Sequence, residues 1–154
     1  MRFKREISSR LLELSKQFPA IILTGARLGI NESSIASSPF LGQLWETLVC
    51  AEFRRRIKNS DQYGALWFYR DKRAREIDFV YEQENKLDFF EVKWTSEPLA
   101  KSIHSMTEIY KDMSERKKTL IQLGETFLLC RASNSYPFAD NSQVTNLEYF
   151  LRPR

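Results

Sequence analysis

From Pro39 onward the spacing of apolar residues changes three times, and these changes restrict the fold more than any other feature. From Pro39 to about Ile57, apolar residues recur every three or four positions, which is typical of an amphipathic helix. Three runs rich in aromatic and β-branched residues follow and predict strands, at 65–69, 76–81 and 86–94. A second helical spacing at 99–113 and a buried apolar run at 126–130 complete the pattern. The order helix, three strands, helix, strand (αβββαβ) predicts an α/β protein built on one mixed β-sheet.

The chain is long enough to bury a core. It has 154 residues, of which 42% are hydrophobic, and these values are typical of one packed domain. Residues 2–17 predict a short amphipathic helix and 144–151 a closing strand. Cys50 and Cys130 lie among apolar neighbours and are predicted to be buried thiols in a reducing compartment. No apolar run approaches the roughly 20 residues that cross a bilayer, so the sequence predicts a soluble, cytoplasmic domain without a membrane partner.

An incomplete phosphate-binding loop lies near the N-terminus. Ala20 to Leu23 is predicted to be a buried strand, and Thr24-Gly25-Ala26-Arg27 follows it, as at the beginning of a P-loop. A complete P-loop also needs a second glycine followed by Lys and Ser or Thr, whose side chains contact the phosphates and Mg²⁺. Here Ile30 and Asn31 follow Gly29, and the lysine is absent. The sequence therefore predicts no ATP cofactor and no ATP hydrolysis.

The positive charge of the chain is concentrated in one segment. The formal net charge is +4, but residues 54–75 alone carry +6, with two acidic residues among eight basic ones. The basic residues are Arg54, Arg55, Arg56, Lys58, Arg70, Lys72, Arg73 and Arg75. Such a concentration is typical of a surface that binds the phosphate backbone of nucleic acid. A solvated helix end followed by a charged turn explains the same charge equally well.

Two carboxylates and a lysine lie within the predicted strands. Asp78 belongs to the second strand, while Glu91 and Lys93 belong to the third, where a spacing of two residues puts both on one face. If the two strands form a hairpin around Glu84-Asn85, the two carboxylates can lie side by side. Adjacent carboxylates repel each other, and a bound cation relieves that repulsion.

The same group suggests a reaction. A divalent metal at the carboxylates is a Lewis acid beside a scissile phosphate, and Lys93 can orient the attacking water or help to deprotonate it. Because His104 is the single histidine and no Cys/His ligand set exists, carboxylates would hold the metal, which favours Mg²⁺ or Mn²⁺. Two alternatives stay open: a solvated charged face of a strand, and a buried salt bridge between Lys93 and one of the carboxylates.

Three motifs in this order resemble those of the PD-(D/E)XK nuclease superfamily: Gly42…Trp45-Glu46, Glu76-Ile77-Asp78 and Glu91-Val92-Lys93. The resemblance implies a restriction-endonuclease-like fold, in which helices flank a mixed four-stranded sheet. It also implies a Mg²⁺ or Mn²⁺ site surrounded by Glu46, Asp78 and Glu91, with Lys93 as the fourth catalytic residue. The superfamily has a proline before the aspartate, where this chain has Ile77, and an apolar strand position tolerates that difference.

A longer string of residues resembles, more narrowly, domain of unknown function 4143, the C-terminal domain of a large prokaryotic family of AAA-type ATPases. The string runs from Leu28-Gly29-Ile30 through Ser38-Pro39, Leu44-Trp45-Glu46, Phe68-Tyr69-Arg70 and both acidic strand motifs, and it covers about residues 28–151. Residues 18–27 resemble the opening of that family's ATPase domain, without its Gly-Lys-Thr. The resemblance implies a remnant of an ATPase N-terminus at 1–27 and a nuclease-like domain at 28–154.

The sequence thus leads to a hypothesis with two alternatives. The hypothesis is a metal-dependent nuclease domain that acts on or binds DNA. The first alternative keeps the fold but not the activity, as a nucleic-acid or protein-binding module. The second is an inactive, truncated remnant of an ATP-binding protein of the same family. A protein partner or a homo-oligomer is compatible with the sequence, although no residue pattern indicates one.

Overall fold

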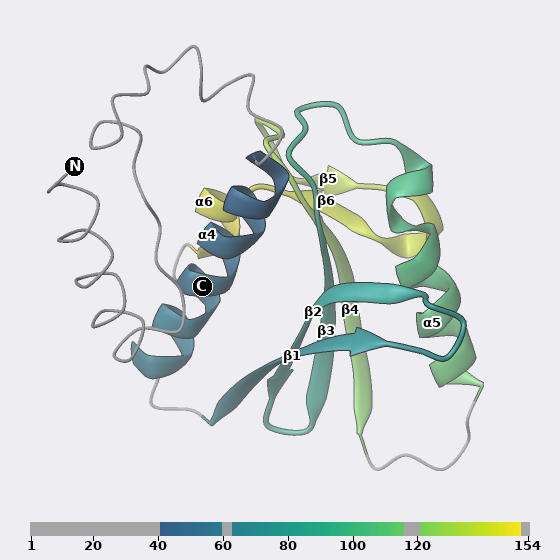
Figure 1. The fold of residues 1–154 in the computed structure, drawn as a ribbon. Helices are drawn as coiled ribbons and strands as arrows, with labels where there is room; N and C mark the ends of the chain where they lie inside the picture. The colour runs from purple at the N-terminus through teal and green to yellow at the C-terminus, as the bar shows by residue number, and fades with distance from the viewer. Residues whose placement is uncertain (1–40, 60–62, 116–120, 152–154) are drawn as a thin grey trace, which may run out of the picture. The chain divides into compact units, whose positions relative to one another are not determined.

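The computed structural model of the chain describes residues 41–59, 63–115 and 121–151 (Figure 1). The chain divides into two compact units, residues 1–51 and 52–154, and the β-sheet lies wholly in the second unit. The predicted helix at 2–17, the predicted strand at 20–23 and the incomplete phosphate-binding loop lie outside the described residues.

Helices and strands follow one another in the predicted order. The first helix, α4 (Leu41–Asn59), precedes three strands: β1 (Gly64–Arg70), β2 (Glu76–Gln83) and β3 (Lys86–Val92). A 3₁₀ turn, η1 (Ala100–Ile103), leads into α5 (His104–Ser114), and β4 (Gln122–Leu129) follows. The last elements are β5 (Tyr136–Pro137), a second 3₁₀ turn η2 (Ala139–Asn141), β6 (Gln143–Thr145) and α6 (Leu147–Leu151). The helices and strands predicted between residues 39 and 130 are therefore confirmed, with shifted ends.

The sheet is mixed and has six strands in the order β1-β2-β3-β4-β6-β5. β2 pairs antiparallel with β1 and β3, and β3 pairs parallel with β4, to which the chain returns through α5. β4 also pairs parallel with β6, and β5 adds an antiparallel strand at the far side. The predicted α/β class and mixed sheet are confirmed, and two short strands enlarge the four-stranded sheet that the resemblance implied.

The hairpin between β2 and β3 forms where the sequence predicts it. Gln83 pairs with Lys86, so Glu84 and Asn85 make the turn. Glu84 has a φ of 55°, a left-handed conformation that tight hairpin turns require. This turn fixes the register in which the β2 carboxylate faces β3.

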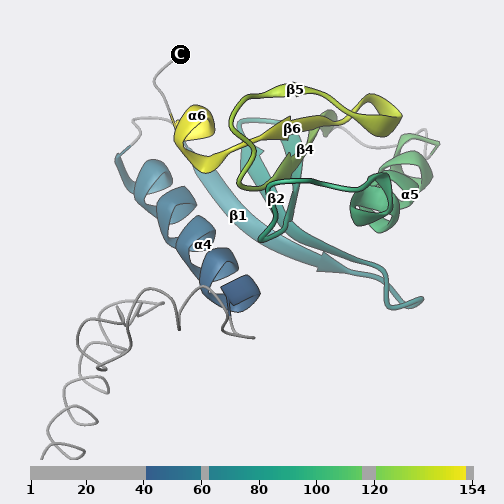
Figure 2. The same cartoon turned by 90° about the horizontal axis from the view of Figure 1, so that it is seen from above.

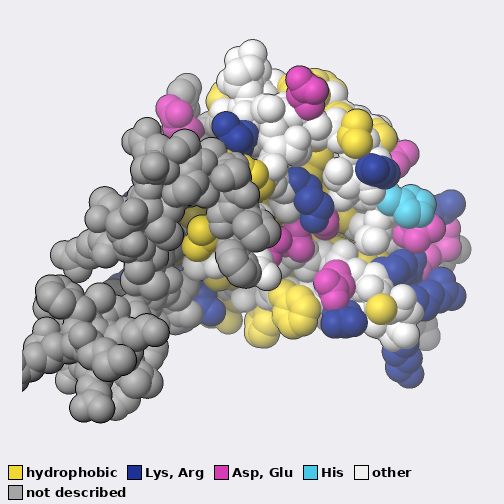
Figure 3. Space-filling model, turned by 45° about the horizontal axis from the view of Figure 1, so that its top comes forward, with side chains coloured by type: hydrophobic (Ala, Val, Ile, Leu, Met, Phe, Trp, Pro, Cys, Tyr) yellow, Lys and Arg dark blue, Asp and Glu magenta, His cyan; other side chains and the backbone are white. Residues whose placement is uncertain are grey.

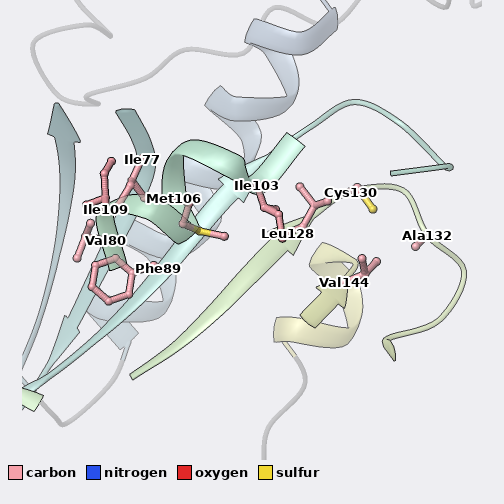
Figure 4. Close-up of a cluster of buried hydrophobic side chains, with 10 residues drawn as sticks. All are labelled: Ile77, Val80, Phe89, Ile103, Met106, Ile109, Leu128, Cys130, Ala132 and Val144. Atoms are coloured by element: carbon pink, nitrogen blue, oxygen red, sulfur yellow. The ribbon is translucent and has the colours of Figure 1, made fainter. Parts of the chain in front are cut away.

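One face of the sheet packs against α5. Ile103, Met106 and Ile109 are buried there against strand residues such as Val80 and Phe89, as Figure 4 shows. Ile103 and Met106 belong to the spacing that predicts the helix, Ile109 lies one turn further along, and all three belong to one buried cluster on this face. Leu99, predicted to belong to the same buried stripe, is 57% exposed, because it precedes η1 and lies outside the helix.

Aromatic rings cover the opposite face of the sheet. Phe90 follows Phe89 in β3, and successive strand residues point to opposite faces. The Phe90 ring centroid lies 4.8 Å from that of Phe53 in the second half of α4, and 5.0 Å from that of Phe150 in α6. Figure 2 shows α6 and α5 on the two sides of the sheet. The helices thus sandwich the sheet between two apolar layers.

The predicted closing strand at 144–151 is wrong in its second half. Only Gln143–Thr145 forms a strand, and Leu147–Leu151 is helical. Asn146 explains the change, because its Oδ1 accepts a hydrogen bond from the backbone N–H of Tyr149 at 2.6 Å, which is the bond of a helix N-cap. The aromatic composition of this segment favours a strand, but the capping residue decides its structure.

Two further predictions bear on the environment of the chain. Cys130 is buried, as predicted, whereas Cys50 is half-buried, and the two are free thiols. Among the helices of the described residues, none has the length and apolar character needed to cross a membrane.

Candidate functional site

Asp78 lies in a β-bulge near the start of β2. The pairing of β2 with β1 moves from Val80 to Ile77 while β1 advances by two residues, so β2 contains one extra residue here. As a result Ile77 and Val80 both point into the core beneath α5. A bulge re-aims the neighbouring side chain, and bulges are common beside active sites. The bulge thus sets the direction of the Asp78 side chain.

The Asp78 carboxylate reaches the end of β3. Its Oδ2 atom accepts a hydrogen bond from the backbone N–H of Val92 at 2.8 Å. Lys93 Nζ lies 3.6 Å from the same oxygen and 2.6 Å from Glu91 Oε1. Three of the four predicted site residues, Asp78, Glu91 and Lys93, therefore form one contiguous group.

Glu91 is the buried member of this group. Only 12% of its side chain is exposed, against 40% of the side chain of Lys93. Burial, followed by the negative charge of Asp78, raises the pKa of Glu91 to about 7, although the Lys93 ammonium lowers it. A carboxyl group with this pKa exchanges its proton near neutral pH, which is rare for glutamate and common at functional sites.

Glu46, the fourth predicted residue, belongs to the first half of α4. That half lies in the unit of residues 1–51, whereas Asp78, Glu91 and Lys93 lie in the unit of residues 52–154. Within the unit of residues 52–154, the group contains two carboxylates and one lysine, and the role predicted for Glu46 stays a prediction.

The carboxylate pair has the chemistry of a magnesium ligand set. Within residues 41–59, 63–115 and 121–151, no group of three or more His, Cys, Asp or Glu side chains is arranged to hold a metal ion. Mg²⁺, however, usually keeps several waters and binds one or two carboxylates together with substrate phosphates. Asp78 and Glu91 match that mode, because a cation between them offsets the repulsion that raises the pKa of Glu91.

Comparison with known protein families gives one match. The model of a domain of unknown function, DUF4143, matches residues 41–150. The chain belongs to this family. The resemblance to the DUF4143 domain noted in the sequence is confirmed, over a range that begins later than predicted. No curated protein and no solved structure matches the chain.

The basic segment of this DUF4143 chain is divided by β1 into two groups. Arg54, Arg55 and Lys58 are exposed in the last turns of α4, before β1 begins. Arg56 is partly buried: its Nη1 donates to the Phe150 carbonyl at 2.9 Å, and its guanidinium lies 5.1 Å from the centre of the Phe150 ring. Arg55 pairs with Glu52 at 2.7 Å. Arg55 and Arg56 therefore already have partners within the protein, whereas Arg54 and Lys58 are exposed.

The second basic group forms the turn between β1 and β2. Lys72 and Arg73 are exposed, and Arg70 pairs with Glu76 at 3.1 Å. Arg75 instead joins the turn to α5, because its guanidinium pairs with three carboxylates: Asp71, Glu108 and Asp112. Figure 3 shows basic and acidic side chains interspersed on the face in view.

Two side chains beside the site were not singled out by the sequence analysis. The guanidinium carbon of Arg131 lies 4.2 Å from the centre of the Trp94 ring, and Trp94 directly follows Lys93. The sequence contains no signal for this contact, because Trp94 and Arg131 are 37 positions apart and meet only because β3 pairs parallel with β4.

Proposed function

We propose that this DUF4143 chain is a divalent-metal-dependent phosphodiesterase that cleaves nucleic acid, with DNA as its substrate. The observation that carries the proposal is the convergence of Asp78, Glu91 and Lys93 at one end of the sheet. The raised pKa of Glu91 adds to it, because strongly perturbed pKa values cluster at functional sites. On this proposal the sheet is a restriction-endonuclease-like fold in a cytoplasmic nuclease-like domain, preceded by the remnant of an ATPase at 1–27.

In the proposed reaction, the two carboxylates bind the metal and the lysine acts on the water and the phosphate. Asp78 and Glu91 would hold Mg²⁺ or Mn²⁺, which when bound supplies a Lewis acid for a phosphate oxygen. Glu91 must lose its proton to act as a ligand, so metal affinity rises as the pH passes 7. Lys93, whose ammonium lies 2.6 Å from Glu91 Oε1, would orient the attacking water and stabilise negative charge on the phosphate.

A nicking assay with supercoiled DNA tests the proposal. We expect nicking with Mg²⁺ or Mn²⁺ and none with EDTA. Asp78→Asn and Lys93→Met should each lower the rate by about 100-fold or more, as is usual when a group that acts on the transition state is removed.

A matched control pair lies at the opposite end of the same strand. Lys86 Nζ lies 3.2 Å from Asp88 Oδ1, so Lys86→Met and Asp88→Asn disturb an acid–lysine pair of similar chemistry. These variants should nick DNA at close to the wild-type rate. Nicking that persists in EDTA, or that survives Asp78→Asn, would show that the site does not carry the activity.

The exposed cations of residues 54–75 would hold the DNA backbone without reading its sequence. Arg75→Ala separates this role from a structural one. We expect it to lower the Tm by several degrees, because it leaves three carboxylates without their shared cation, and to change DNA affinity little. Arg73 lies in the same turn but is exposed, so Arg73→Ala should weaken DNA binding and change the Tm little. Thermal melting and fluorescence anisotropy measure both effects, and lost DNA binding with an unchanged Tm in Arg75→Ala would assign Arg75 to the DNA surface instead.

The edge strand β1 favours a second candidate function, a non-catalytic docking module. Among the described strands β1 pairs only with β2, and Trp67 and Phe68 are 55% and 69% exposed on it. Edge strands with exposed aromatic side chains pair readily with another chain. If docking is the function, Phe68→Lys abolishes association with a partner in pull-down assays, whereas Asp78→Asn leaves it intact.

A further inference from the structure

We propose that Arg131, stacked on Trp94, is a binding site for the phosphate backbone of the nucleic acid strand next to the bond that is cleaved. The inference rests on the proposed function for the kind of ligand, since it takes Asp78 and Glu91 as the place where the reacting phosphate lies. Arg131 would hold the nucleic acid backbone beside that reacting phosphate.

The first support is position. β3 and β4 are parallel, so both carboxyl ends lie at the same end of the sheet. Lys93 continues the pairing, with its backbone N–H donating to the Leu129 carbonyl at 3.0 Å. The N–H of Arg131 then donates to the Thr95 carbonyl at 2.7 Å. Arg131 therefore stands beside the segment that leaves the candidate site, one strand away from Lys93.

The second support is the rigidity of its backbone. Cys130 and Ala132, on either side of Arg131, are both buried, and both belong to the core cluster drawn in Figure 4. The Cys130 N–H donates to the Thr145 carbonyl at 3.0 Å, and Asn146 Nδ2 donates to the Ala132 carbonyl at 2.9 Å. An exposed arginine held between two buried residues loses little backbone entropy when it binds a ligand.

The third support is the charge of Arg131. Arg55, Arg70 and Arg75 each pair with at least one carboxylate. Among the residues that the structure describes, no carboxylate pairs with Arg131. Its guanidinium lies 4.2 Å from the Trp94 ring centre, and an aromatic face orients a cation without neutralising it. The edge of a stacked guanidinium keeps its N–H groups for a planar, bidentate acceptor, which is how arginine binds phosphate.

The contact between Arg131 and Trp94 also indicates how the nucleic acid strand is bound. A guanidinium covers one face of Trp94, and 37% of the surface of Trp94 is exposed. The ring therefore supports Arg131, and the group that faces the ligand is the guanidinium. A guanidinium binds backbone phosphate whatever the neighbouring base is. Trp94 is thus a positioning residue, and Arg131 makes the contact.

The test is the salt dependence of binding to duplex DNA, measured by fluorescence anisotropy in EDTA with the full chain. Arg131→Gln should weaken the Kd by about fivefold to tenfold at 0.1 M salt and reduce the slope of log Kd against log salt by about 0.9, the value of one lost phosphate contact. Arg131→Lys should restore the slope, because it keeps the charge. A residue with only a structural role would not show that rescue.

Lys111→Ala removes an exposed cation from the last turn of α5 and serves as the matched control, with wild-type slope and Kd expected. Each variant is melted to confirm that it folds. If Arg131→Gln has the slope of Lys111→Ala, Arg131 does not contact the backbone and the inference is wrong. If the slope falls but wild-type protein does not nick DNA, Arg131 contacts the backbone of bound DNA, while the proposed phosphodiesterase activity and the placement of Arg131 beside a cleaved bond both fail.

Discussion

Replacing Glu91 with glutamine should make the protein more stable at pH 8 while removing its activity. Burial and the charge of Asp78 raise the pKa of Glu91 to about 7, from the 4.5 of a solvated glutamate. Folding therefore favours the protonated carboxyl group, and this contribution to stability is complete below pH 4.5 and is lost as the pH rises through 7. The difference between the two pKa values corresponds to about 3 kcal/mol.

Glutamine has the shape of the protonated side chain and does not ionise. At pH 8 we expect Glu91→Gln to raise the free energy of unfolding by about 2–3 kcal/mol, and at pH 5 the difference should become much smaller. Urea denaturation at the two pH values measures this. Asp88→Asn, which removes a carboxylate from a partly exposed pair with Lys86, is the control variant and is measured at the same two pH values.

The same variant tests the metal site. Mg²⁺ should raise the Tm of the wild-type protein at pH 8, because a ligand that binds only the folded state stabilises it by mass action, and it should not raise the Tm of Glu91→Gln. A loss of stability in Glu91→Gln at pH 8 would have a different meaning. It would show that the pair with Lys93 is a net stabilising salt bridge, which is the structural alternative that the sequence left open.

The sequence predicts the fold wherever one pattern dominates. α4 and α5 follow from spacings of three and four, and the hairpin between β2 and β3 follows from two strand-like runs joined by Glu84-Asn85. The same hairpin is enough to predict that Asp78 and Glu91 meet. The restriction-endonuclease-like fold and the DNA substrate stay predictions, since they come from a resemblance rather than from these patterns.

Other features depend on contacts that local patterns do not contain. The aromatic residues at 147–151 favour a strand, yet the side chain of Asn146 caps a helix. The bulge at Asp78 appears only when β2 pairs with β1. Likewise the +6 segment looks continuous in sequence, but Arg75 is bound by three carboxylates, two of which belong to α5. In each case a partner that is distant in sequence, or a single capping atom, decides the local structure rather than the composition of the segment.

The largest loss of stability is expected from Phe53→Ala. Phe53 is fully buried, and its ring lies 4.8 Å from Phe90, 5.2 Å from Phe150 and 5.8 Å from Tyr81, measured between centroids. Removing it leaves a cavity that these rigid rings cannot fill, so the free energy of unfolding should fall by about 3–5 kcal/mol. Urea denaturation monitored by circular dichroism measures the change.

Phe68→Ala is the matched control, because the same atoms are removed from a side chain that is 69% exposed. It should change the free energy of unfolding by less than about 0.5 kcal/mol. The comparison also tests how the second half of α4 is held, since Phe53 is its fully buried side chain and Arg54 and Arg55 follow directly. If Phe53→Ala were no more destabilising than Phe68→Ala, the aromatic layer would not hold this part of the helix, and the cations that follow Phe53 would have no fixed position from which to bind DNA.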